Sequence, residues 1–164
     1  MSFQKHVNAN QALGNVGQIS KAHHSFLNVI PAIAADDFVK VGSFVQSKTS
    51  PTNENEVIGA SGKQITGSIL GVVVRDSLKV AGDSTPTLEV KKGENCAVLT
   101  EGSIFIEVSV QAKKGKYVML KTDDGSLGFY DTNTQGGHTY TGFRVSKGHD
   151  TATAGLIEIT TARA

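Results

Sequence analysis

The chain has 164 residues, a formal net charge of +1, one cysteine and no tryptophan. This length allows one hydrophobic core with a tail, and nothing indicates two cores joined by a linker. Because lysine and arginine are spread along the whole chain, no basic stripe is available for a row of phosphates, and nucleic acid is a poor candidate partner. A single cysteine excludes an intrachain disulfide framework and is typical of synthesis in a reducing cytoplasm.

Residues 1–25 contain few large apolar side chains and show no strand or helix periodicity. They predict an extended N-terminal arm, followed by a single β domain over residues 26–164. The opening residues lack the apolar stretch of a signal peptide, and the apolar run 26–35 is short and interrupted by Asn28 and Pro31. We therefore expect no membrane span and no membrane partner.

Three consecutive segments describe the first half of this domain. Residues 38–45 are rich in β-branched and aromatic side chains and predict a strand that bends at Gly42. The polar stretch 46–56 contains proline, asparagine and glutamate and predicts an exposed loop. The continuous apolar run 69–74 predicts a strand that is buried on both faces and lies at the centre of the fold.

The clearest alternation lies at 104–110, where four apolar side chains share one face and Phe105 lies on the other with two polar residues. Such a pattern predicts a strand with one buried face. The turn signals 113–115 and 123–125 flank an apolar segment and predict two adjacent hairpins.

Short strands are also expected at 87–90, 96–100, 140–145 and 156–160. Together with the segments above they make about eight to ten short strands at near-regular spacing, and the 18 glycines suit tight turns. The chain is therefore predicted to be all-β, as a jelly-roll-like sandwich or a small β-barrel with an extended N-terminal arm.

Few groups suggest a metal site. His23-His24 and Asp36-Asp37 have suitable side chains, but adjacent histidines in an extended chain point to opposite sides. Cys96 lies in an apolar segment, which is typical of a small buried side chain and not of a reactive thiol. The sequence predicts no metal and no cofactor.

A small hydrolase would need His138, or His149 with Asp150, to act as a base beside a serine nucleophile. No strand-to-helix nucleophile elbow accompanies these residues. We expect that the protein is not an enzyme and that replacing either histidine with alanine leaves its function intact.

Five segments follow one another in an order that can be compared with a known family. They are Met1-Ser2-Phe3-Gln4-Lys5 with Val7-Asn8, Val41-Gly42-Ser43-Phe44, Ile69-Leu70-Gly71-Val72-Val73-Val74-Arg75, Lys92-Gly93 followed by Val98-Leu99 and Gly102, and Lys114-Gly115-Lys116-Tyr117-Val118 running into Asp124-Gly125. Together, over nearly the whole chain, they resemble the structural cement proteins of tailed bacteriophages.

The resemblance implies a jelly-roll-like or barrel-like domain with an extended arm, assembled as dimers or trimers on the outer face of an icosahedral head. There it would bridge neighbouring major capsid protein subunits and stabilise the expanded shell, after synthesis in the host cytoplasm. The candidates for the capsid interface are the opening residues Phe3, Gln4, Lys5, Val7 and Asn8. Deleting residues 2–25 is expected to leave the β domain folded and to weaken capsid binding.

A carbohydrate-binding or adhesin-like β module of a phage tail or cell surface is the main alternative, because it shares the fold class. Glycan sites usually need an exposed aromatic platform. The chain has no tryptophan, which favours the cement protein, but Tyr117, Tyr130 and Tyr140 keep the alternative open.

Overall fold

The computed structural model describes residues 14–20, 27–37, 39–75, 88–149 and 154–161. These residues are all-β, as predicted, and form twelve strands arranged as a closed barrel, a five-stranded sheet and a two-stranded ribbon. Among them, no helix has the length and apolar character that crossing a membrane requires.

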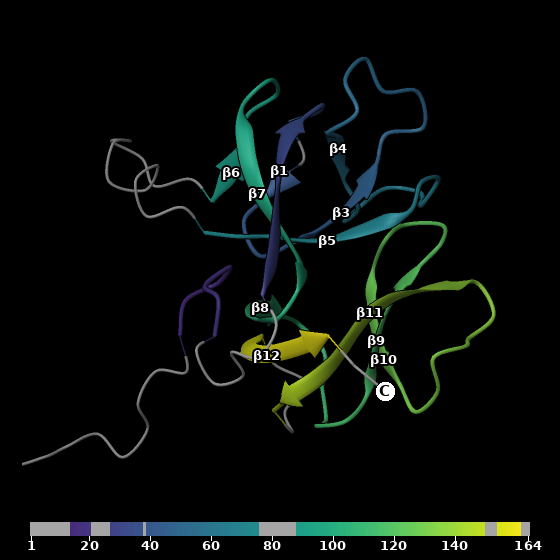
Figure 1. Cartoon of the computed structure of the whole chain (residues 1–164). Coiled ribbons are helices and arrows are strands. Elements are labelled where there is room, and N and C mark those ends of the chain that lie inside the picture. The colour runs from purple at the N-terminus through teal and green to yellow at the C-terminus, as the bar shows by residue number, and fades with distance from the viewer. Residues whose placement is uncertain (1–13, 21–26, 38, 76–87, 150–153, 162–164) are drawn as a thin grey trace, which may run out of the picture.

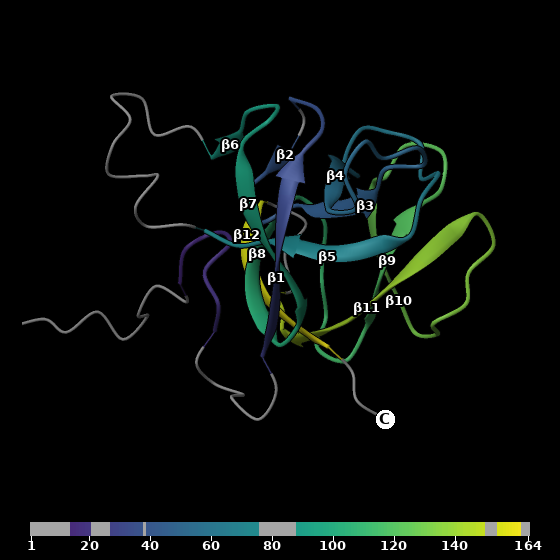
Figure 2. The same cartoon turned by 45° about the horizontal axis from the view of Figure 1, so that its top comes forward.

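The barrel lies above the five-stranded sheet in the view of Figure 1, and Figure 2 shows the same arrangement from a tilted direction. In order around the barrel the strands are β1 (Asn28–Ala34), β4 (Glu56–Gly59), β3 (Phe44–Ser47), β5 (Ile69–Val73) and β7 (Asn95–Glu101). In order across the sheet they are β10 (Leu127–Tyr130), β9 (Tyr117–Lys121), β11 (His138–Lys147), β12 (Gly155–Thr161) and β8 (Ser103–Val108). The ribbon consists of β2 (Val39–Lys40) and β6 (Glu89–Val90).

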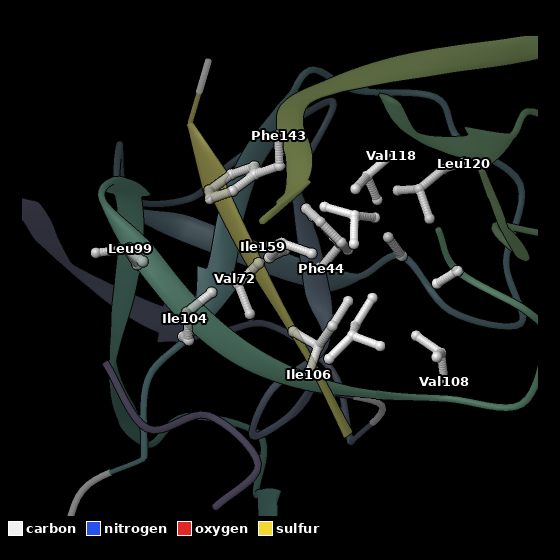
Figure 3. Packing of buried hydrophobic residues seen from close by; sticks show 14 of the residues in the cluster. Phe44, Val72, Leu99, Ile104, Ile106, Val108, Val118, Leu120, Phe143 and Ile159 are labelled. Carbon is white, nitrogen blue, oxygen red and sulfur yellow. The ribbon is translucent and has the colours of Figure 1, made fainter. Parts of the chain in front are cut away.

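Two hydrophobic cores hold these parts together. Val73 of β5 packs inside the barrel, whereas its neighbour Val72 packs between the barrel and the sheet, against the cluster that contains Phe143 and Ile159 (Figure 3). Neighbouring side chains of a strand point to opposite faces, so β5 is buried on both faces, as predicted. The barrel wall therefore contributes side chains to both cores.

Gly42 separates β2 from β3 with a φ of 75°, which confirms the predicted bend. The strands expected at 96–100, 140–145 and 156–160 are also confirmed, within β7, β11 and β12. Of the strand expected at 87–90, residues 89 and 90 form β6.

The alternation predicted for 104–110 holds only in part. Ile104, Ile106 and Val108 are buried, but β8 ends there and Val110 is 43% exposed. The expectation of one buried face is wrong, because Phe105 on the opposite face is only 5% exposed.

Only one of the two predicted hairpins is present. The 123–125 turn joins β9 to β10, which pair in antiparallel fashion. The 113–115 turn does not close a hairpin, because β8 pairs with β12 over six residue pairs and not with β9.

The sequence interpretation missed β1, which contains Pro31. Ile33 donates its N–H to the carbonyl oxygen of Asn55, the residue before β4. Backbone groups alternate along a strand, so the nitrogen of Pro31 points to the same side, beyond the first residue of β4. The missing N–H therefore leaves no ladder partner unpaired, which is the setting where a strand tolerates proline.

The prediction of a polar loop over 46–56 is wrong at both ends and correct for the exposed residues 49–55. Gln46 belongs to β3 and is fully buried. Its Nε2 donates to the carbonyl oxygen of Gln64 at 3.1 Å, and its Oε1 accepts the N–H groups of Thr66 and Gly67 at 2.8 and 2.9 Å. A buried amide is tolerated when its polar atoms are bonded in this way.

Candidate contact surface

The residues predicted for the capsid interface, Phe3, Gln4, Lys5, Val7 and Asn8, lie outside the described residues. Their role stays a prediction. The described surface nevertheless contains two features that bear on partner binding.

The first feature is the segment 14–20, which lies along the open edge of β8. Three backbone hydrogen bonds of 2.8–3.0 Å join it to Ser103 and Phe105. Gly14 lies so close to the Phe105 ring that a Cβ at this position would be 2.5 Å from Cδ2. This contact explains why Phe105 is buried, and it places the described part of the predicted arm, residues 1–25, against the sheet.

The second feature is a row of side chains across the face of the sheet that points away from the barrel. Cross-strand pairs place five residues in this row, from β10 to β8: Tyr130, Tyr117, Arg144, Thr160 and Ser103. Their chain neighbours Val118, Phe143 and Ile159 pack in the core between barrel and sheet. Because neighbouring residues alternate, the row must face outward.

We call Tyr117, Tyr130, Tyr140, His138 and Arg144 the tyrosine–arginine cluster; all five are partly exposed. Tyr140 lies on the same outward face, because it pairs with Met119, which is two residues from Tyr117 on β9. The cluster thus brings together all the tyrosines of the chain. Tyrosine and arginine are among the residues most enriched at the energetic centres of protein interfaces.

Arg144 lies at the centre of the tyrosine–arginine cluster. Its guanidinium carbon is 4.0 Å from the centre of the Tyr117 ring, and its Nη2 donates a hydrogen bond to Tyr117 Oη. The Tyr140 ring meets Tyr117 edge to face, with 5.5 Å between centroids.

Burial raises the pKa of Tyr140 above its ordinary value, and the Arg144 guanidinium opposes this shift only partly. The Tyr140 phenol is therefore neutral at physiological pH and can donate a hydrogen bond.

Tyr130 and His138 form a second pair of interacting side chains within the cluster. Tyr130 Oη lies 2.9 Å from His138 Nε2, and His138 Nδ1 lies 2.8 Å from the carbonyl oxygen of Gly136. The carbonyl can only accept, so in neutral His138 the proton sits on Nδ1 and Nε2 accepts from the phenol. This pairing fixes both side chains at the base of the β10–β11 connection.

The arrangement suits contact with a protein better than stacking of a sugar. A sugar platform needs an open ring face. The Arg144 guanidinium covers one face of Tyr117, and the Tyr130 ring packs against His138 at 4.9 Å and 66°. The rings are therefore engaged with one another and do not present a common flat surface.

The residues considered for catalysis are far apart. His138 begins β11, whereas His149 follows the end of this ten-residue strand and pairs with Ala112 through backbone hydrogen bonds. Asp150 lies outside the described residues. The two histidines therefore lie near opposite ends of β11 and do not share one site.

The candidate metal ligands are similarly separated. Asp36 accepts the N–H of Gly59 and pairs with Lys63, and Cys96 is a partly buried residue of β7. His23-His24 lies outside the described residues. Within the residues that the structure covers, no three histidine, cysteine, aspartate or glutamate side chains form a group that could hold a metal ion.

The sequence interpretation did not single out Arg144 and considered the tyrosines only as separate glycan contacts. One local signal was available: Arg144 stands between two apolar residues, Phe143 and Val145, and so had to face away from the core. Which residues lie beside it depends on the pairing of β9 with both β10 and β11, which a single sequence does not specify.

Comparison with known proteins finds a matching family and several similar structures, including two from bacteriophages. The family model described as "Structural cement protein (E217 gp24/Pam3 gp6)" matches residues 3–162. A chain in "The capsid of Myoviridae Phage XM1" is 17% identical with a TM-score of 0.60, and the match covers 99% of both chains. A chain in "The crystal structure of head fiber gp8.5 N base in bacteriophage phi29" is 13% identical with a TM-score of 0.47, over 85% of this chain and 97% of that one. No curated protein matches the sequence. The XM1 likeness shows a shared fold.

Proposed function

Because the chain belongs to the structural cement protein family of bacteriophages, we propose that it is a capsid cement protein that binds the outer surface of a tailed-phage head. It stabilises the expanded shell by bridging major capsid protein subunits. The family match over residues 3–162 carries this proposal, because it spans nearly the whole chain. The resemblance of the opening residues, the β5 segment and the Asp124-Gly125 hairpin supports the same conclusion.

The mechanism is preferential binding to one state of the shell. A ligand that binds the expanded state and not its alternatives stabilises that state by about 2.7 kcal/mol per site when its free concentration is 100 times the Kd. A dimer or trimer of the chain would engage several capsid subunits at once. Modest single contacts then become a long-lived attachment, because each later contact forms within the same complex.

Two parts of the chain supply the contacts in this proposal. The opening residues Phe3, Gln4, Lys5, Val7 and Asn8 remain the candidates for the arm, which would order along a capsid subunit. The tyrosine–arginine cluster offers a preformed surface, because its side chains already hold one another in place. A preformed surface loses little side-chain entropy on binding.

The proposal is tested with expanded heads that lack the protein. We expect purified protein to sediment with these heads and to raise the temperature at which they rupture. Heads that neither bind the protein nor gain heat resistance from it would contradict the proposal.

The arm is tested with a deletion of residues 2–13. A deletion of residues 2–25 would also remove the 14–20 segment and uncover Phe105, so lost binding could reflect a damaged sheet. The shorter deletion keeps these contacts. We expect it to leave the thermal unfolding of the isolated protein unchanged and to weaken head binding. Unchanged binding would exclude a role for the opening residues.

A further inference from the structure

Arg144 differs from the other cations near it. Lys116, Lys121 and Lys147 each lie within 4.0 Å of a carboxylate, those of Asp131, Asp124 and Glu158 respectively. Across the described residues, no carboxylate pairs with Arg144. Its Nε–H is buried and has no hydrogen-bond partner there.

The described partners of Arg144 are the phenol side chains of two tyrosines. Tyr117 accepts a hydrogen bond from Nη2, and Tyr140 lies close enough for the guanidinium to influence its pKa. Phenols neutralise no charge, and a partly buried charge without a counter-ion is costly. The arrangement is therefore electrostatically incomplete within the described chain.

The same groups form a suitable site for a carboxylate. A guanidinium has five N–H donors in a planar fork that matches the two oxygens of a carboxylate. Tyr117 Oη accepts from Arg144, so its own hydrogen remains available to donate. Tyr140 is neutral and offers another O–H. Arg144 contacts Tyr117 and lies near Tyr140, so donors from three side chains lie close together on the outward face of the sheet.

We propose that Arg144, with Tyr117 and Tyr140, forms a carboxylate-binding site that receives an acidic side chain of the head surface. This proposal rests on the proposed function for the identity of the partner, but not for the existence of the site. A nucleic acid is a poor occupant, because the nearby lysines are already paired with carboxylates and one cation cannot follow a phosphate backbone. An acidic side chain needs only one fork and two hydroxyl groups.

The site itself is tested without capsids, by titrating the isotope-labelled protein with sodium acetate against sodium chloride at equal ionic strength and pH 7. We expect a saturable change in the NMR signal of the Arg144 Nε–H, and none with chloride. Arg144→Gln should abolish acetate binding, as read from the aromatic signals of Tyr117 and Tyr140. Tyr140→Phe should weaken it while the Arg144 signal remains as a reporter. A linear or absent response in the unmodified protein would overturn the site.

The matched control is Lys121→Gln, which removes one positive charge from the same face of β9 as Tyr117 but lies outside the proposed site of Arg144, Tyr117 and Tyr140. Arg144→Gln should raise the Kd for expanded heads about tenfold or more, whereas Lys121→Gln should leave it within about twofold. Equal effects of the two variants would indicate a general charge effect and overturn the inference. Head binding by Arg144→Gln at the original affinity would also overturn it.

Two further outcomes separate the possible failures. If the unmodified protein does not bind heads, the proposed function fails and the head is not the partner, while the acetate titration still decides whether the site exists. If Arg144→Gln instead changes the sedimentation coefficient of the isolated protein, the carboxylate comes from a second copy of the chain, and the assignment to the head is overturned.

Discussion

Gln46 shows how one side chain can connect two parts of the barrel. Its amide is buried in β3 and bonds to three backbone groups of residues 64–67, on the segment that leads into β5. An apolar side chain of similar size would fill the space but leave two N–H groups and one carbonyl without partners. Each buried group left unpaired costs about 1–3 kcal/mol.

We therefore predict that Gln46→Leu lowers the free energy of unfolding by about 2 kcal/mol or more, measured by urea denaturation. Gln135→Leu is the control, because the same substitution there falls on an exposed residue of the β10–β11 connection. Equal stability of the Gln46 variant and the original protein would show that the amide bonds contribute nothing.

Glu56 provides a pH-dependent test. The hydrogen bond from Lys48, followed by the backbone N–H of Thr52, holds the pKa of Glu56 below its ordinary value of 4.5. A carboxyl whose pKa is lower in the folded state contributes stability above its ordinary pKa, and this contribution disappears as the pH falls through the lowered value. We predict that Lys48→Met moves the pKa of Glu56 towards 4.5, as an NMR titration would show. The variant should also lose less stability on acidification.

At the scale of strands and turns, the 123–125 turn connects the sheet to the barrel. Gly125 has a φ of 65°, and a Cβ there would be 1.8 Å from the carbonyl oxygen of Ala60. Both the backbone conformation and the close approach require glycine.

We predict that Gly125→Ala lowers the melting temperature by several degrees, from a loss of about 1–3 kcal/mol. Gly136→Ala is the matched control, because a Cβ at Gly136 would meet no atom within 4 Å and the φ of this residue is not positive. Differential scanning calorimetry of both variants measures the difference. Equal melting temperatures would mean that the turn can move away from Ala60 without cost.

The strands that were predicted correctly are marked by a local pattern within their own residues. The run 69–74 is continuously apolar, and 140–145 and 156–160 are bounded by turn residues. The missed strand β1 contains Pro31, and its position beyond the start of β4 makes that proline harmless only in the folded barrel. β4 was missed because it follows directly on a polar loop.

Pairing between strands is where prediction from sequence failed. The 113–115 turn carries a good hairpin signal, yet both edges of β8 are taken by β12 and the 14–20 segment. The tyrosine–arginine cluster was missed for the same reason, since its members come from β9, β10 and β11. Such contacts depend on non-local register, which is specified by the whole core and not by any single segment.

At the scale of the whole molecule, the barrel and the sheet share one of the two hydrophobic cores, the one that lies between them. Phe44 of the barrel meets Phe143 of the sheet edge to face, with 5.7 Å between ring centroids, and both are almost fully buried (Figure 3). A large interior contact of this kind couples the two parts into one unfolding unit.

We predict that Phe143→Ala destabilises the protein by about 3–5 kcal/mol, and that barrel and sheet strands still unfold in one transition. Hydrogen exchange measured at β5 and at β9 checks this, because both should lose protection together. Leu27→Ala is the control with little expected effect, since Leu27 is 54% exposed. Separate transitions would show that the barrel and the sheet are independent domains.

The way the 14–20 segment runs along β8 has a mechanical consequence. Its bridge to β8 is antiparallel, and its three backbone bonds to Ser103 and Phe105 follow one another along the strand. Tension that enters the chain at Gly14 along the strand direction is shared among these bonds in shear and does not open them one at a time. If an expanding shell pulls on the residues before Gly14, the force is transmitted through these hydrogen bonds into β8 and the sheet. The edge of β8 would then resist detachment of the segment under tension.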